Sequence, residues 1–191
     1  MNIKRDLLKI PNLISLYRLM VSFLIPFLWI TGVDWRWLYF FLITGALSDT
    51  LDGNLARILK QKTSLGKVLD PLADKVFINM LFFLLYWEGK ITLSFFGVIL
   101  GRDLFIFLGS LYLIKKGYPL SGLAPTLLGK ASTVFQLVAL LTLYIDLHLK
   151  ELPTLMIKYV LNLAIFFTAA SGFHYLLIFK RLRLKEVTPQ P

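Results

Sequence analysis

The chain of 191 residues contains no cysteine, which excludes structural disulfides and thiolate metal sites. Charged residues are also scarce, at 17% of the sequence, whereas hydrophobic residues make up 57% and aromatic residues 15%. Soluble domains carry about 25% charged residues and roughly 45–50% apolar ones. This shortage of charge predicts an integral membrane protein and excludes an ordinary water-soluble domain.

Long apolar runs account for most of the chain. A membrane-spanning helix needs about 20 mainly apolar residues, and turn-forming residues divide this chain into runs of that kind. We therefore expect an all-α fold with six transmembrane helices. They are predicted at about residues 13–32, 35–48, 69–87, 91–114, 124–145 and 154–179.

The two ends of the chain differ from this six-helix domain, which we assign to residues 12–185. Residues 1–11 carry Ile3, Leu7 and Leu8 on one helical face with basic residues beside them. This pattern predicts a short amphipathic helix on the membrane surface. Residues 186–191 are expected to form a C-terminal tail.

The basic residues predict the orientation. The chain has 21 basic and 11 acidic residues, for a net charge of +10. With a cytoplasmic N-terminus, fourteen basic residues fall on the cytoplasmic side and three on the other, which is the bias of the positive-inside rule. We therefore expect both termini in the cytoplasm, at the cell (inner) membrane, and contact with anionic lipid rather than nucleic acid. The fourteen are Lys4, Arg5, Lys9, Arg57, Lys60, Lys62, Lys67, Lys115, Lys116, Lys130, Lys180, Arg181, Arg183 and Lys185.

Four carboxylates lie at or near the ends of two apolar segments. Asp49 and Asp52 are three residues apart, and Asp70 and Asp74 are four residues apart, so each pair lies on one face of its helix. The short loop between the two segments makes the helices antiparallel neighbours. Because ionisable groups inside a membrane are costly, such residues usually face a polar cavity together with a partner.

Four carboxylates in one small space repel one another unless they are protonated or neutralised by cations. Oxygen ligands without histidine or cysteine favour Mg²⁺ or Mn²⁺ over zinc, and two such ions could clamp a diphosphate. Gly53 and Ala56 leave room for a flat group against the backbone, Arg57 is suited to phosphate, and Gly66 opens the third segment without bulk. The alternative is a set of salt bridges at the loop ends.

The complete pattern is highly specific. It runs Asp49-x2-Asp52-Gly53-x2-Ala56-Arg57-x8-Gly66-x3-Asp70-x3-Asp74 and resembles, without departure, the signature of the CDP-alcohol phosphotransferase family. The similarity extends to the Pro11-Asn12-Leu13 start and to Arg18 in the first apolar segment.

The resemblance implies a role for each residue. It implies that Asp49, Asp52 and Asp70 are metal ligands, and that Asp74 shares the second metal and is the base that activates the acceptor hydroxyl. It also implies a homodimer whose helices surround a polar cavity, and transfer of a phosphatidyl group from CDP-diacylglycerol to a glycerol-type acceptor, with CMP released. The residues expected at the CDP and diphosphate site are Asp52, Gly53, Ala56, Arg57, Gly66 and Asp70.

Two further cations within the apolar segments, Arg102 and Lys130, are candidates for binding an anionic acceptor. The alternative for Arg102 is an ion pair with Asp103 that locks helices together. Residues 69–75 and 128–133 resemble phosphatidylglycerophosphate synthases, which favours glycerol 3-phosphate as the acceptor. That branch usually has Arg-Glu where this chain has Arg102-Asp103, followed by a Leu-Arg that is missing here. Residues 101–103 and 168–172 resemble cardiolipin synthases, whose acceptor is phosphatidylglycerol.

Two other classes also place acidic residues near apolar helices. A divalent-cation transporter would not need Gly53, Ala56 and Arg57 at fixed offsets from the acids. A polyprenyl transferase would carry two separated aspartate-rich loops and more helices. Release of CMP, rather than ion flux or pyrophosphate, distinguishes the expected enzyme from both.

Overall fold

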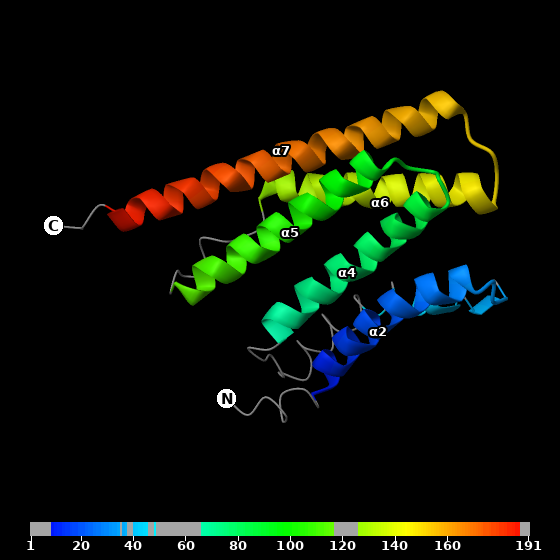
Figure 1. The fold of residues 1–191 in the computed structure, drawn as a ribbon, viewed down its shortest axis with the longest axis horizontal. Coiled ribbons are helices and arrows are strands. Elements are labelled where there is room, and N and C mark those ends of the chain that lie inside the picture. The colour runs from blue at the N-terminus through cyan, green and yellow to red at the C-terminus, as the bar shows by residue number, and fades with distance from the viewer. Residues whose placement is uncertain are drawn as a thin grey trace. The chain divides into compact units, whose positions relative to one another are not determined.

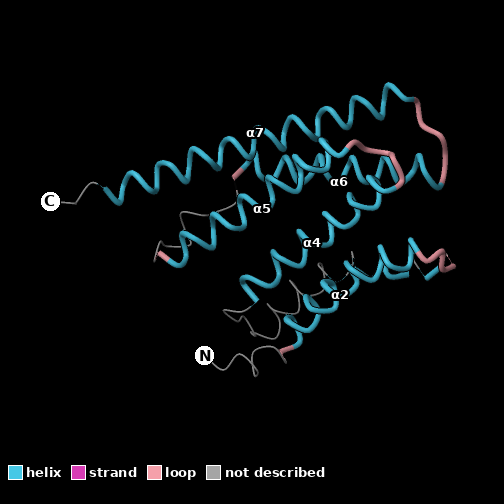
Figure 2. The backbone as a smooth tube through the Cα atoms, in the orientation of Figure 1, coloured by secondary structure: helices cyan, strands magenta, loops and turns pink. Residues whose placement is uncertain are grey.

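The structure, a computed structural model, describes residues 9–34, 36–37, 40–45, 48, 66–116 and 126–187, without the side chains of 67, 68 and 183–187. Within these residues the helices with defined bounds are α2 (Ile10–Ile30), α4 (Gly66–Trp87), α5 (Leu93–Lys115), α6 (Leu127–His148) and α7 (Thr154–Val187) (Figure 1). Residues 36–37, 40–45 and 48 are also helical. No strand occurs in the described part of the chain (Figure 2). The expected all-α class is confirmed.

The helix ends follow from local sequence. Gly32, just past α2, and Gly89, just past α4, have φ angles of +66° and +69°, a left-handed conformation that glycine adopts without strain. The Thr92 side chain caps α5 by accepting a hydrogen bond from the Phe95 amide at 3.2 Å. Thr126 caps α6 in the same way through the Gly129 amide at 3.0 Å. Each cap satisfies an amide that has no partner inside its helix.

Four helices are long and apolar enough to cross a membrane, judged by length and composition over the described residues: Ile10–Ile30, Leu93–Lys115, Leu127–His148 and Thr154–Leu182 of α7. The predicted segment at 69–87 is helical, but α4 is not among the four because charged residues crowd its first turns. The predicted segment at 35–48 lies only partly within the described residues, and residues 1–8 and 188–191 lie outside them.

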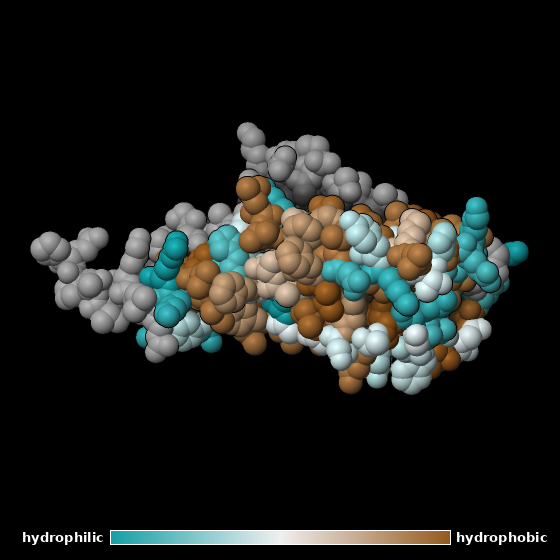
Figure 3. Space-filling model, turned by 90° about the horizontal axis from the view of Figure 1, so that it is seen from above, coloured by the Kyte–Doolittle hydropathy of each residue, from teal (hydrophilic) through white to brown (hydrophobic). Residues whose placement is uncertain are grey.

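The described helices bury many polar side chains and expose many large apolar ones. The buried face of α2 carries Asn12, Ser15, Arg18 and Ser22, none more than 1% exposed. Large apolar side chains point outward instead, and Phe27 on the same helix is 62% exposed. Hydrophobic side chains likewise make up much of the face seen in Figure 3. Soluble proteins bury apolar residues and expose polar ones, so this pattern suits a lipid environment.

The chain divides into two compact units, Met1–Leu84 and Leu85–Pro191. In the first unit, Val21 and Ile25 of α2 form a small core with Phe77 and Leu84 of α4. The helical segment at 40–45 joins this core at Gly45, where a Cβ atom would lie 2.6 Å from the Phe77 ring. Glycine therefore allows the close approach of this segment to α4.

In the second unit, α7 packs against both α6 and α5 (Figure 1). The rings of Phe135 on α6 and Phe167 on α7 stack with centroids 4.4 Å apart. Away from these rings, Lys90 before α5 forms an ion pair with Asp146 near the end of α6 at 3.1 Å. The Asp146 carboxylate also accepts a hydrogen bond from the Leu152 amide at 3.1 Å. These contacts fix the loops at one end of the second unit.

Candidate functional site

Two of the four predicted carboxylates lie on α4. Asp70 and Asp74 are one turn apart near its N-terminal end, and both are partly exposed. Gly66, the first residue of α4, is buried. The other predicted site residues of the motif, Asp49, Asp52, Gly53, Ala56 and Arg57, lie outside the described residues.

Asp70 is held by a side chain of α2. The Ser15 hydroxyl donates a hydrogen bond to Asp70 Oδ1 at 2.6 Å. The same hydroxyl lies 3.1 Å from the carbonyl oxygen of Pro11, so the shorter contact is the one to the carboxylate. Because Ser15 has no exposed surface, its hydroxyl must be satisfied inside the protein.

Asp74 is held by a second residue of α2. The Arg18 guanidinium forms an ion pair with Asp74 Oδ1, and its Nε donates to Ser48 Oγ at 2.9 Å. The Ser48 hydroxyl in turn donates to the carbonyl of Gly45 at 2.6 Å. Arg18 is 1% exposed, so a buried cation connects α4 to the residue directly before Asp49.

The donor set near Asp70 and Asp74 fits a hard divalent cation. Both carboxylates offer oxygen atoms, which Mg²⁺ and Mn²⁺ prefer. Among the described residues no group of three or more histidine, cysteine, aspartate or glutamate side chains is assembled. Asp49 and Asp52, which would complete a four-carboxylate site, lie outside the described residues.

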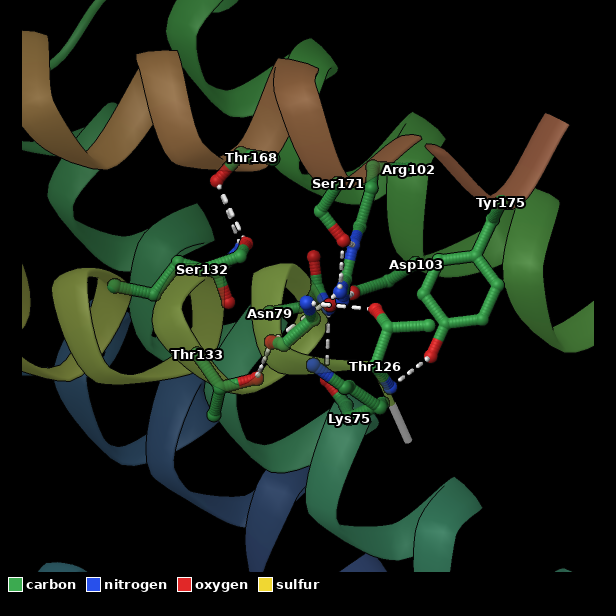
Figure 4. Close-up of polar contacts among 12 residues, drawn as sticks. Lys75, Asn79, Arg102, Asp103, Thr126, Ser132, Thr133, Thr168, Ser171 and Tyr175 are labelled. Atoms are coloured by element: carbon green, nitrogen blue, oxygen red, sulfur yellow. Dashed lines mark hydrogen bonds and ion pairs between the residues drawn. The ribbon is translucent and has the colours of Figure 1, made fainter. Parts of the chain in front are cut away.

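The second unit contains a buried cation of its own (Figure 4). Arg102 on α5 donates to Asp103 Oδ1 through Nη1 at 2.6 Å. Its Nη2 donates to Ser171 Oγ on α7 at 2.7 Å, and Nε contacts the same oxygen at 3.2 Å. Nη2 also lies 3.5 Å from the carbonyl oxygen of Gly129 on α6. One side chain therefore contacts three helices.

An aromatic ring borders this cluster. Arg102 Cζ lies 6.0 Å from the centre of the Tyr175 ring, within the range of a cation–π interaction. The Tyr175 hydroxyl accepts a hydrogen bond from the Thr126 amide at 3.3 Å. A Cβ atom at Gly129 would lie 3.2 Å from that hydroxyl, so a glycine suits this position. Contacts with Asp103, Ser171 and Tyr175 thus hold the Arg102 side chain in place.

The predicted acceptor residues have different environments. Arg102 is buried and forms the ion pair with Asp103 that the helix-locking interpretation predicts. Lys130 follows Gly129 in the first turn of α6 and is exposed. The structure therefore brings Arg102 close to the residue before Lys130, and it leaves the Lys130 side chain at the surface of the chain.

Sequence reasoning missed three serines that hold these charged groups: Ser15, Ser48 and Ser171. A signal for the first was present, because the polar residues of α2 recur every three or four positions and thus form one stripe on an apolar helix. The same spacing relates Thr168, Ser171 and Tyr175 on α7. In a helix whose other face is apolar, such a stripe marks the side that packs inside the protein.

A model of the CDP-alcohol phosphatidyltransferase family matches residues 8–170. The chain belongs to this family. The expectation drawn from the aspartate motif is therefore confirmed. The matched region contains α2, α4, α5, α6 and the first half of α7. It includes Ser15, Arg18, Asp70, Asp74, Arg102 and Asp103, and it ends one residue before Ser171.

Curated relatives with two different names match this chain. A CDP-diacylglycerol–glycerol-3-phosphate 3-phosphatidyltransferase of Aquifex aeolicus (strain VF5) is 36% identical over 137 residues, covering 71% of this chain and 75% of the relative. The protein of the same name from Salmonella choleraesuis (strain SC-B67) is 32% identical over 170 residues, covering 84% and 86%. A cardiolipin synthase (CMP-forming) of Rattus norvegicus is 28% identical over 181 residues, covering 87% and 60%.

Family membership bears on the metal. CDP-alcohol phosphatidyltransferases use divalent metal ions, in agreement with the oxygen-only donors around Asp70 and Asp74. The choice between Mg²⁺ and Mn²⁺ stays a prediction, because both ions prefer the same ligands.

Proposed function

We propose that this protein transfers the phosphatidyl group of CDP-diacylglycerol to glycerol 3-phosphate, giving phosphatidylglycerophosphate and CMP. One observation carries the proposal. Asp70 and Asp74 of the family motif lie one turn apart on α4, and both are held by α2 through Ser15 and Arg18. Relatives named as glycerol-3-phosphate 3-phosphatidyltransferases support the choice of acceptor.

The proposed reaction exchanges a phosphoanhydride bond of the nucleotide for a phosphodiester bond to the acceptor. The acceptor hydroxyl forms a bond to the phosphorus that carries the diacylglycerol, and the bond from that phosphorus to CMP breaks. Asp74 accepts the proton of the attacking hydroxyl. The Arg57 guanidinium binds the phosphates of the nucleotide.

Two divalent ions, Mg²⁺ or Mn²⁺, complete the proposed site. Asp49, Asp52, Asp70 and Asp74 would hold them, and when bound they supply charge neutralisation of the diphosphate. The CDP moiety is assigned to Asp52, Gly53, Ala56, Arg57, Gly66 and Asp70.

The acceptor site is proposed at Arg102 and Lys130. A phosphate-bearing acceptor needs cations, and Arg102 is held by Ser171 and Asp103 at the meeting of three helices. Phosphatidylglycerol, the acceptor in cardiolipin synthesis, is the second candidate. Relatives named as cardiolipin synthases favour it.

The proposal also includes the membrane topology and the assembly. We propose six membrane-spanning helices around a polar cavity, with both termini and the active site on the cytoplasmic side of the cell (inner) membrane. The four long apolar helices and the asymmetry of basic residues support this topology. A homodimer is part of the proposal, and chemical cross-linking in native membranes tests it.

The decisive experiment measures products. The protein, purified in detergent, is incubated with Mg²⁺, CDP-diacylglycerol and one acceptor at a time: glycerol 3-phosphate, phosphatidylglycerol or buffer. We expect CMP release that depends on glycerol 3-phosphate, with phosphatidylglycerophosphate formed. CMP release with phosphatidylglycerol alone would identify the second candidate. Ion flux in proteoliposomes without CMP release would instead indicate a transporter.

The role of Asp74 is tested separately. Asp74→Asn keeps the size of the side chain and removes its basicity. We expect loss of turnover, while binding of a CDP nucleotide, measured by calorimetry, stays close to that of the unchanged protein. Retained turnover would refute the assignment of Asp74 as the base.

A further inference from the structure

The polar stripe of α2 has no role in the proposed reaction, although it touches both carboxylates of α4. We propose that Ser15 and Arg18 are positioning residues, which orient Asp70 and Asp74 for binding a divalent cation. This inference rests on the proposed function of the two aspartates. It adds two residues that lie more than fifty positions away from them in the sequence.

The first part of the argument is the contact between Ser15 and Asp70. A hydrogen bond of 2.6 Å to a carboxylate is in the short range of charge-assisted bonds. It occupies one lone pair of Oδ1, which fixes the rotation of the carboxylate group. Ser15 lies on α2 and has no exposed surface, so packing restricts the position of its hydroxyl.

The second part is the position of Arg18. Its guanidinium contacts Asp74 through Nη1 and Ser48 through Nε. The two contacts use different nitrogens of one rigid planar group. They therefore fix the distance between α4 and the helical residue that precedes Asp49. A divalent ion shared by ligands of both helices requires that distance to be correct.

A purely structural role would not explain the pairing pattern. Small apolar residues at 15 and 18 would pack against α4 without burying a hydroxyl or a cation, and buried polar groups are costly in an apolar setting. Second-layer hydrogen bonds to ligands typically change metal affinity or activity about 10–100-fold when they are removed. Metal binding, in addition to stability, should therefore respond to these two residues.

The Ser15 test compares Ser15→Ala with Ser22→Ala. Ser22 lies on the same helix, is equally buried, and donates to a backbone carbonyl four residues earlier, at 2.7 Å. The readout is the dissociation constant for Mn²⁺, measured by electron paramagnetic resonance on protein without substrate. We expect the constant to rise about tenfold in Ser15→Ala and to stay within about twofold in Ser22→Ala. Ser15→Thr, which keeps the hydroxyl, should restore Mn²⁺ binding.

The Arg18 test uses Arg18→Lys and Ser48→Ala. Arg18→Lys keeps the positive charge but removes the planar group that reaches two partners. If orientation matters, Mn²⁺ affinity falls about tenfold; if only charge matters, it is unchanged. Ser48→Ala removes the second partner of Arg18 and should lower the affinity in the same direction, so the test holds even if Arg18→Lys does not fold.

Unchanged Mn²⁺ affinity in Arg18→Lys and Ser48→Ala would overturn the part of the inference that concerns Arg18, and two results would overturn the part that concerns Ser15. Unchanged Mn²⁺ affinity in Ser15→Ala, together with a lower unfolding temperature, would assign Ser15 to structure alone. Equal losses of Mn²⁺ affinity in Ser15→Ala and Ser22→Ala would also assign Ser15 to structure alone. Failure of the proposed function is distinguishable, because the unchanged protein would then release no CMP with any acceptor. The Mn²⁺ measurements do not depend on that activity.

Discussion

Ser171 of α7 accepts two hydrogen bonds from Arg102 of α5, at 2.7 Å from Nη2 and 3.2 Å from Nε. The two residues are 69 positions apart in the sequence. The remaining guanidinium nitrogen, Nη1, faces the carboxylate of Asp103. A single buried cation is thus anchored to its own helix and to α7, and its charge is matched by the adjacent residue.

The first prediction concerns this ion pair. Asp103→Leu leaves Arg102 buried without its counter-charge, and we expect the free energy of unfolding to fall by about 3–5 kcal/mol. Arg102→Met combined with Asp103→Leu removes both charges and should restore most of the loss, as measured by thermal unfolding in detergent. A double variant as unstable as Asp103→Leu alone would contradict the prediction.

The second prediction separates the two interpretations of Arg102. Ser171→Ala keeps both charges but removes the anchor on α7. If Arg102 binds the acceptor, the KM for glycerol 3-phosphate rises severalfold while the KM for CDP-diacylglycerol hardly changes. If the pair only locks helices, the unfolding temperature falls and neither KM changes. Steady-state kinetics with each substrate varied in turn distinguishes the two outcomes.

The third prediction concerns the close approach of α5 to α7. A Cβ atom at Gly109 would overlap the ring of Phe179, so Gly109→Ala should lower the free energy of unfolding by about 1–3 kcal/mol. Gly97 on the same helix has open space around it. Gly97→Ala should therefore raise stability by about 0.5–1 kcal/mol, because alanine is the better helix former. Equal effects of the two changes would refute the packing argument.

The fourth prediction concerns the polar contact between α6 and α7. Gln136 donates through Nε2 to Thr168 Oγ1 at 3.1 Å. Its buried Oε1 has no partner among the described residues. Gln136→Leu removes that unsatisfied oxygen, so we expect a change in unfolding free energy within about 1 kcal/mol.

Thr168→Val is the matched variant. It leaves the Gln136 amide with only a 3.4 Å contact to Ser132, and it should destabilise the protein more than Gln136→Leu does. Thermal unfolding of both variants in the same detergent gives the comparison. A loss of stability larger for Gln136→Leu would show that the amide contributes more than its contacts with Thr168 and Ser132 imply.

The fifth prediction uses the absence of cysteine. Any introduced cysteine is the sole thiol of the chain. Lys116→Cys, just after α5, and Lys150→Cys, just after α6, therefore report on which side of the membrane each helix ends, without labelling of other thiols. We expect a membrane-impermeant thiol reagent to label position 116 from the cytoplasmic side and position 150 from the opposite side. Lys60→Cys and Lys185→Cys should both be labelled from the cytoplasmic side, and labelling of these two positions from different sides would overturn the proposed orientation.

The helices that consist of long apolar runs could be predicted from the sequence. The predicted segment at 91–114 corresponds to α5 and the segment at 154–179 lies within α7, because a run of apolar residues between breakers has few other stable conformations in lipid. Helix ends were less accurate: α7 continues to Val187, since polar and basic residues are good helix formers beyond the apolar run.

Within the site, only the relationships between residues close in sequence could be predicted. The spacing of Asp70 and Asp74 on one helical face could be read from sequence, because helix periodicity is local. Their partners on α2 could not, because a pairing across 55 residues depends on how two helices pack. The pairing of Arg102 with Ser171 has the same cause, whereas its pairing with Asp103 was foreseen as an alternative.

The length of α7 has a consequence for its place in a bilayer. At 1.5 Å per residue, its 34 residues extend about 51 Å, whereas the hydrocarbon core is about 30 Å thick. Lying wholly inside that core would require a tilt of about 54°, beyond the usual range of membrane helices. If α7 spans a bilayer, we therefore expect one end of the helix to extend past the acyl chains, which would bring the basic residues Lys180 and Arg181 to the level of the lipid phosphates.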